Sequence, residues 1–221
     1  MPRSPDTRHH ARAPRRARLL ARLCMMACIA GAIGPLAPPP ARAAEPPATA
    51  AAAWGVDQLM SVLAQRKSGR VAFTEKKYLA MLERPVESSG ELVFLAPDHL
   101  EKRTIAPKPE NLVLDGDMLT VERAGKQFVL PLQNYPEMAA FIESIRGTLA
   151  GNRNALERYY RLGIQGRATR WTLTLTPADS RMAGIVRQIR IDGARDTLDS
   201  VEIVQADGDR SVMKIKPVAA P

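Results

Sequence analysis

The sequence predicts a mainly β (α+β) fold, with about ten strands in antiparallel meanders and two or three helices. Short runs of alternating apolar and polar residues recur through residues 71–215, which is the pattern of half-buried strands. Turn pairs such as Asp115-Gly116 and Asp192-Gly193 separate many of these runs. Most connections are too short for the crossover helix that parallel strands require. A sheet of this size usually curls, so helices, a ligand or both must fill its concave face.

The first predicted element is an amphipathic helix over residues 54–67. Leu59, Met60 and Leu63 recur near helical spacing there, and Gly69 ends the segment. The pattern then changes to the period of two that strands require. Six strands are predicted, at residues 71–82, 91–95, 100–105, 112–114, 118–122 and 127–130.

Two further helices and a second meander complete the predicted fold. Pro136 suits the first turn of a helix over residues 136–149, and Asn152 can cap a short helix over residues 155–159. Tryptophan and leucine then alternate with threonine in the first strand of the second meander. The strands of this meander are predicted at residues 171–176, 185–191, 197–205 and 211–215.

Residues 1–43 have the layout of a secretory signal peptide. Seven arginines precede an apolar run over residues 23–36, and the small-residue sequence Ala41-Arg42-Ala43 follows. We expect cleavage after Ala43 and a periplasmic location. A retained membrane anchor and a lipid anchor at Cys28 are the alternatives. We further predict a flexible arm at 44–53, one folded domain at 54–216 and a tail at 217–221.

The leader accounts for most of the positive charge of the chain. It holds eight of the 32 basic residues and one of the 23 acidic residues, which leaves 24 and 22 in the exported part. The net charge therefore falls from +9 to +2, and the basic character gives no reason to expect a nucleic-acid partner. Both cysteines, Cys24 and Cys28, also lie in the leader, so the exported chain has no disulfide.

The exported residues offer little of the chemistry that enzymes use. His99 is their one histidine and lies in a predicted turn, and no serine has a nucleophile-elbow context. There is no cysteine–histidine cluster for zinc and no glycine-rich phosphate loop. The aspartates lie mainly in turns, where their backbone role explains them. We therefore expect no enzyme activity, no metal and no cofactor.

Several loose motifs occur in an order that resembles the periplasmic outer-membrane lipoprotein carrier family, LolA and its relatives. The resemblance covers nearly all of residues 54–216, and the chain looks like a divergent branch. The motifs are Phe73-Thr74-Glu75, Gly90-Glu91-Leu92-Val93-Phe94, Pro97, Leu100, Leu112–Leu114 before Asp115-Gly116, the helix at 136–149, and the strand 171–176 before Pro177.

The resemblance implies a half-open antiparallel β-barrel whose concave face is lidded by helices around an apolar cavity for acyl chains. It implies a lipidated protein or lipid as cargo, and an inner-membrane transporter and an outer-membrane acceptor as partners. We expect a monomer. The family also has an arginine that holds the lid, at the position of Ala96 in this sequence. That latch is missing here unless a neighbour such as Arg103 replaces it.

Apolar strand positions and the helix at 136–149 supply the candidate lipid-binding residues. An ordinary closed core would use the same residues, and an inverted strand register would turn Val93, Leu95 and Val113 inward instead. The candidates are Val71, Phe73, Leu92, Phe94, Leu112, Leu114, Phe128, Leu130, Met138, Phe141, Ile142, Ile145 and Trp171.

Three functions fit the sequence. The first is a periplasmic carrier or chaperone that binds the acyl chains of a lipoprotein or other lipidated cargo for transfer towards the outer membrane. The second is a periplasmic sensor or regulatory module on the same fold that transports nothing. The third is a small periplasmic hydrolase.

Overall fold

The structure, a computed structural model, describes residues 54–218, which form eleven strands, four α-helices and one short 3-10 helix. The expected leader and arm, and residues 219–221 of the expected tail, lie outside the described residues. The strands are β1 (Ser68–Tyr78), β2 (Val86–Leu95), β3 (His99–Ala106), β4 (Glu110–Asp115), β5 (Met118–Arg123), β6 (Lys126–Pro131), β7 (Tyr160–Arg167), β8 (Arg170–Pro177), β9 (Val186–Ala194), β10 (Thr197–Gln205) and β11 (Arg210–Pro217). The helices are α1 (Val56–Leu63), η1 (Leu132–Asn134), α2 (Pro136–Leu149), α3 (Arg153–Glu157) and α4 (Ser180–Ala183).

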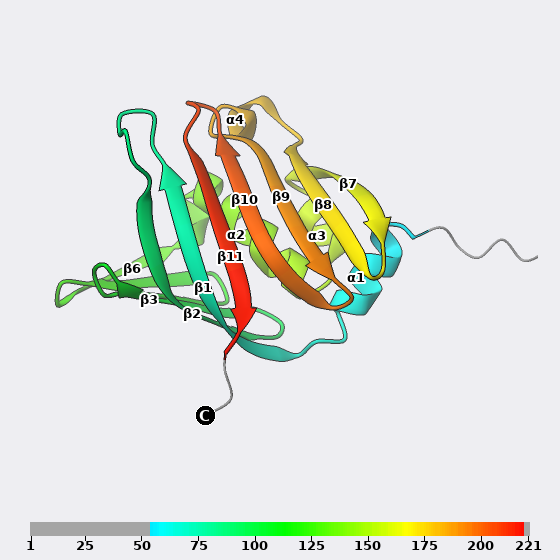
Figure 1. Cartoon of the computed structure of the whole chain (residues 1–221), viewed down its shortest axis with the longest axis horizontal. Coiled ribbons are helices and arrows are strands. Elements are labelled where there is room, and N and C mark those ends of the chain that lie inside the picture. The colour runs from blue at the N-terminus through cyan, green and yellow to red at the C-terminus, as the bar shows by residue number, and fades with distance from the viewer. Residues whose placement is uncertain (1–53, 219–221) are drawn as a thin grey trace, which may run out of the picture. The chain divides into compact units, whose positions relative to one another are not determined.

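All these strands form one antiparallel sheet in the order β6-β5-β4-β3-β2-β1-β11-β10-β9-β8-β7. The meanders β1–β6 and β7–β11 are joined where β1 pairs with β11, with Phe73 opposite Ile215. Strands β6 and β7 lie at the two ends of this order, so the sheet does not close. Figure 1 shows β1 and β8–β11 in front of α2 and α3, with β3–β6 turned behind them. This arrangement confirms the predicted half-open antiparallel barrel with helices over its concave face.

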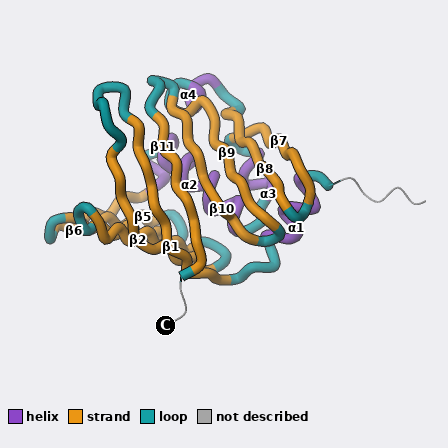
Figure 2. The backbone as a smooth tube through the Cα atoms, in the orientation of Figure 1, coloured by secondary structure: helices purple, strands orange, loops and turns teal. Residues whose placement is uncertain are grey.

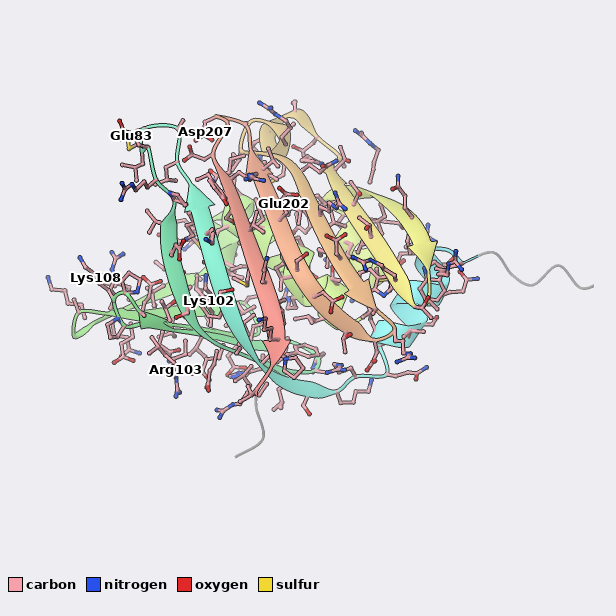
Figure 3. All side chains as sticks on the ribbon, viewed as in Figure 1. Glu83, Lys102, Arg103, Lys108, Glu202 and Asp207 are labelled. Atoms are coloured by element: carbon pink, nitrogen blue, oxygen red, sulfur yellow. The ribbon has the colours of Figure 1, made fainter. Side chains whose placement is uncertain are left out.

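Strand β8 shows how the alternating pattern produces the layers. Trp171, Leu173 and Leu175 are at most 1% exposed, while the threonines between them are half-buried on the other face. The backbone trace places the helices on one side of the strands (Figure 2). On β10, Glu202 faces away from the helices and accepts a hydrogen bond from Arg210 at 3.0 Å (Figure 3). One face of the sheet is therefore packed and the other is solvated.

The predicted helix signals are confirmed at two helix starts. Pro136 is the first residue of α2, where its missing N–H costs nothing. The Asn152 side chain accepts a hydrogen bond from the Ala155 N–H at 3.1 Å and caps α3. Helix α1 is shorter than predicted and ends at Leu63 instead of Lys67.

Helix α2 contacts two separate groups of buried apolar residues. The larger group packs α1, α2 and α3 against β8, β9 and β10, and contains Trp171, Leu173 and Ile191. The smaller group contains Leu114, Leu119 and Leu132, with Met138 and Ile142 of α2 packed against it. The helix therefore spans the space between two packed regions.

The prediction of about ten strands was one strand short. Strand β7 was missed because Gly163 and Gly166 interrupt its apolar pattern, and its inner face carries just Tyr160, Leu162 and Ile164. Helix α4 was also missed. It has four residues and is stabilised by the Asp179 carboxylate, which accepts a hydrogen bond from the Met182 N–H at 2.8 Å.

Candidate functional site

A cavity of about 720 Å³ lies under α2, between the sheet and the helix. Its wall comes from the strands on both sides of the β1–β11 pairing and from the apolar face of α2. Cavities of this volume and apolar character are typical of small-molecule sites. The cavity is therefore the candidate functional site.

Ten of the thirteen residues named from the sequence line this cavity. They come from four strands, β1, β2, β4 and β6, and from helix α2, which the curled sheet brings together. They are Val71, Leu92, Phe94, Leu112, Leu114, Leu130, Met138, Phe141, Ile142 and Ile145. Their common placement keeps them as candidates for lipid binding.

The other three named residues do not line the cavity. Trp171 is 1% exposed within the larger core, and Phe73 is 2% exposed beneath the ammonium group of Lys102. Phe128 is 50% exposed on the edge strand β6, because β6 has no neighbour beyond it to cover the side chain. The alternative register does not occur along β2, since Phe94 is buried and Leu95 is 52% exposed. Val93 nevertheless borders the cavity.

Sequence reasoning missed the contribution of the second meander. Val201 and Ile203 of β10 and Met213 and Ile215 of β11 also line the cavity. Their alternation is visible in the sequence, but the pairing of β11 with β1 is not. That pairing brings these residues to the same wall as Val71.

A polar cluster interrupts the apolar wall. The Lys102 ammonium group donates a hydrogen bond to the Glu75 carboxylate at 2.7 Å and lies 5.0 Å from the centre of the Phe73 ring. The Ser88 hydroxyl donates to the same carboxylate at 3.4 Å, and the Lys77 ammonium group lies 3.9 Å from its other oxygen. The Glu75 side chain is only 6% exposed, so these partners compensate for its burial.

A second ion pair lies at the edge of the cavity. The Arg66 guanidinium group donates to the Asp196 carboxylate at 2.7 Å, and this bond lowers the pKa of Asp196 below its usual value. Both residues also line a smaller groove of about 400 Å³. The pair thus separates the groove from the cavity.

Arg146 ties α2 to the opposite wall. Its guanidinium group donates to the Gly116 carbonyl at 2.7 Å in the turn between β4 and β5, and to the Glu143 carboxylate at 2.6 Å. Arg103 instead donates to Glu101 at 2.9 Å, and Ala96 donates its backbone N–H to the Lys67 carbonyl. Arg146, and not Arg103, is therefore the arginine that fastens this helix.

The described residues contain no group of three or more histidine, cysteine, aspartate or glutamate side chains that could hold a metal ion. His99 lies 3.9 Å from Asp115, away from the cavity wall. Within residues 54–218, no helix is both long and apolar enough to cross a membrane.

Comparison with solved structures finds several chains to which this one is similar. The LolA superfamily protein NE2245 from Nitrosomonas europaea is 11% identical, with a TM-score of 0.39 over 76% of this chain and 96% of that chain. A chain of the MucA/MucB complex of Pseudomonas aeruginosa is 14% identical, with a TM-score of 0.41 over 75% of this chain and 58% of that chain. LprF from Mycobacterium bovis is 13% identical, with a TM-score of 0.30 over 75% and 95%.

Among curated proteins, none matches this chain in sequence. A family model, however, matches the sequence over more than half of the chain. Residues 48–219 match the family described as outer membrane lipoprotein carrier protein LolA-like. The apolar cavity between an open antiparallel sheet and α2 agrees with that description, and the chain belongs to the LolA-like family.

Proposed function

We propose that this protein is a periplasmic carrier or chaperone that binds the acyl chains of a lipoprotein or other lipidated cargo. The observation that carries the proposal is the apolar cavity of about 720 Å³ beneath α2. Membership of a family named for carriers supports it, and the leader expected at residues 1–43 supports the periplasmic location. The cargo would pass from an inner-membrane transporter to an outer-membrane acceptor, and the protein would act as a monomer without a cofactor.

Burial of an acyl chain supplies the binding free energy. Each buried CH₂ contributes about 0.8 kcal/mol, so a chain of about 16 carbons contributes more than ~10 kcal/mol before ordering costs. The walls that would receive the chain include Leu92 and Phe94 on the sheet and Phe141 and Ile145 on α2. Transfer needs no bond to be made or broken, which agrees with a carrier that is not an enzyme.

A charge placed in the cavity tests the proposal. Phe94→Glu or Phe141→Glu should abolish uptake of a fluorescent fatty acid, because an unpaired carboxylate in an apolar wall costs several kcal/mol. Phe128→Glu is the matched control, since Phe128 is half exposed and lies outside the cavity wall. It should bind the probe as the unchanged protein does.

Circular dichroism must show that each variant keeps its strand content. If Phe94→Glu does not fold, Leu112→Trp reduces the cavity volume without adding charge and should also lower uptake. Normal uptake by folded Phe141→Glu and Leu112→Trp would refute the cavity as the binding site.

A further inference from the structure

The polar cluster in the cavity wall lies among apolar side chains. In the strand register, Lys102 of β3 is opposite Leu92 of β2 and Leu112 of β4, and all three residues line the cavity. The apolar stem of the lysine therefore continues the wall, while its ammonium group reaches Glu75 on β1. Figure 3 labels Lys102 near β1 and β2.

The cluster carries more positive than negative charge. Each oxygen of the Glu75 carboxylate faces an ammonium group, one from Lys102 at 2.7 Å and one from Lys77 at 3.9 Å. One carboxylate thus serves two cations, which leaves a net charge of about one positive at neutral pH. The Lys102 side chain is 24% exposed, so a molecule in the cavity can reach it.

The other charged residues around the cavity either form ion pairs with no net charge or lie exposed at its edge. Three ion pairs join a basic and an acidic residue, with one or both members in the cavity wall, and two charged residues lie exposed near strand ends. The pairs are Arg66–Asp196, Arg70–Glu91 and Arg103–Glu101, and the exposed residues are Asp199 and Lys216. The net positive charge therefore belongs to the cluster of Glu75, Lys77 and Lys102, in which Glu75 and Lys102 line the cavity and the half-exposed Lys77 lies outside the lining.

We propose that the cavity takes an amphiphile with an anionic head, a carboxylate or a phosphate, and that Lys102 contacts this head. This inference rests on the proposed acyl-chain function. A lysine ammonium group has three N–H donors, and one of them is used by Glu75. The apolar wall binds acyl chains whatever their head, whereas a partly buried anion requires a cationic partner. The cluster thus selects among molecules that share the same tail.

Three competitors with the same chain separate the head from the tail. Hexadecanoate, hexadecyl phosphate and hexadecanol are each used to displace a fluorescent fatty acid at pH 8. At least one anion should bind about 10-fold more tightly than the alcohol, a difference of about 1.4 kcal/mol. The tighter of the two anions identifies the head as carboxylate or phosphate.

Two variants of the cluster should change anion binding in opposite directions. Lys102→Met should weaken the preferred anion about 10-fold, while Glu75→Gln should strengthen it because the competing carboxylate is gone. Hexadecanol binding should stay the same in both. Lys214→Met is the matched control, since Lys214 is exposed and lies on β11 beyond the cavity wall. If the Glu75–Lys102 pair were purely structural, each variant would instead change the binding of all three competitors by the same factor.

If Lys102→Met does not fold, the double variant Glu75→Gln/Lys102→Met replaces it, because no carboxylate is then left without its closest partner. That variant should lose the preference for anions. Equal displacement by all three competitors in the unchanged protein would overturn the anionic head and leave the acyl cavity intact. Failure of every competitor and of the probe to bind would overturn the proposed function itself.

Discussion

At the scale of single residues, two glycines allow the sheet to pack as it does. A Cβ atom at Gly193 would overlap the Trp171 ring and the Thr197 carbonyl. The absence of a side chain lets the Trp171 ring approach Gly193 of β9 closely, and the indole N–H donates to the Arg195 carbonyl at 3.0 Å. At Gly90 a Cβ atom would overlap the Arg103 carbonyl and lie 3.0 Å from the Phe73 ring. Both positions therefore require glycine for close packing of the sheet.

Replacement of Gly193 tests this packing. Gly193→Ala should lower the free energy of unfolding by about 1–3 kcal/mol, because the tryptophan ring or the β10 backbone must move. Gly163→Ala in β7 is the control, since its nearest contact would be Thr174 Cβ at an ordinary 4.0 Å. Urea denaturation measures both. Equal stability of the two variants would contradict the close packing at Gly193.

At the scale of elements, α2 is the part that decides whether the cavity is covered. The helix contacts both hydrophobic clusters, and Arg146 fastens it to the turn between β4 and β5. The Arg146 side chain is 19% exposed and that of Glu143 is 11% exposed, so their bond is better shielded than a surface pair. The arginine that holds α2 in place, Arg146, belongs to α2 itself. The family arginine would instead lie at the end of β2, at the position of Ala96.

Arg146→Met should destabilise the protein by about 1.5–3 kcal/mol, the usual contribution of hydrogen bonds to charged groups. The substitution should also increase the rate of amide hydrogen exchange more in α2 than in β8. The control is Arg153→Met in α3, where the lost partners Asp57 and Glu157 are exposed and the effect on the free energy of unfolding should be much smaller. Unchanged exchange in α2 would show that Arg146 does not hold the helix over the cavity.

At the scale of the whole molecule, the leader expected at residues 1–43 would determine the compartment in which the fold must be stable. Cleavage after Ala43 would remove both cysteines and leave a chain that depends on its hydrophobic core alone. In the described residues, the larger hydrophobic cluster joins α1, α2, α3 and α4 to the sheet.

We predict an exported form that begins at Ala44. Intact-mass analysis of protein from the periplasm should give the mass of residues 44–221, and its thermal unfolding should not change with a reducing agent. A retained leader, or a mass that includes a lipid on Cys28, would contradict this prediction.

The sequence by itself determined the class of most of the long elements. Alternation specified β8, Pro136 specified the start of α2, and Asn152 specified the cap of α3, because these signals act through neighbouring residues. Alternation also placed six strand candidates on the inner face, and helical spacing placed four candidates on the inner face of α2. The apolar pattern of β7 is interrupted by two glycines, so alternation alone did not identify it as a strand.

Only the tertiary structure decided which inner-face residues meet. Phe128 and Leu130 share one face of β6, yet Phe128 is half exposed and Leu130 lines the cavity, because exposure depends on what packs against the strand. Glu75 and Lys102 form an ion pair although they are 27 positions apart in the sequence. The pairing of β1 with β11 likewise joins the first and last strands of the described fold. These long-range contacts depend on how the sheet curls, which arises from packing over the whole domain and not from any local pattern.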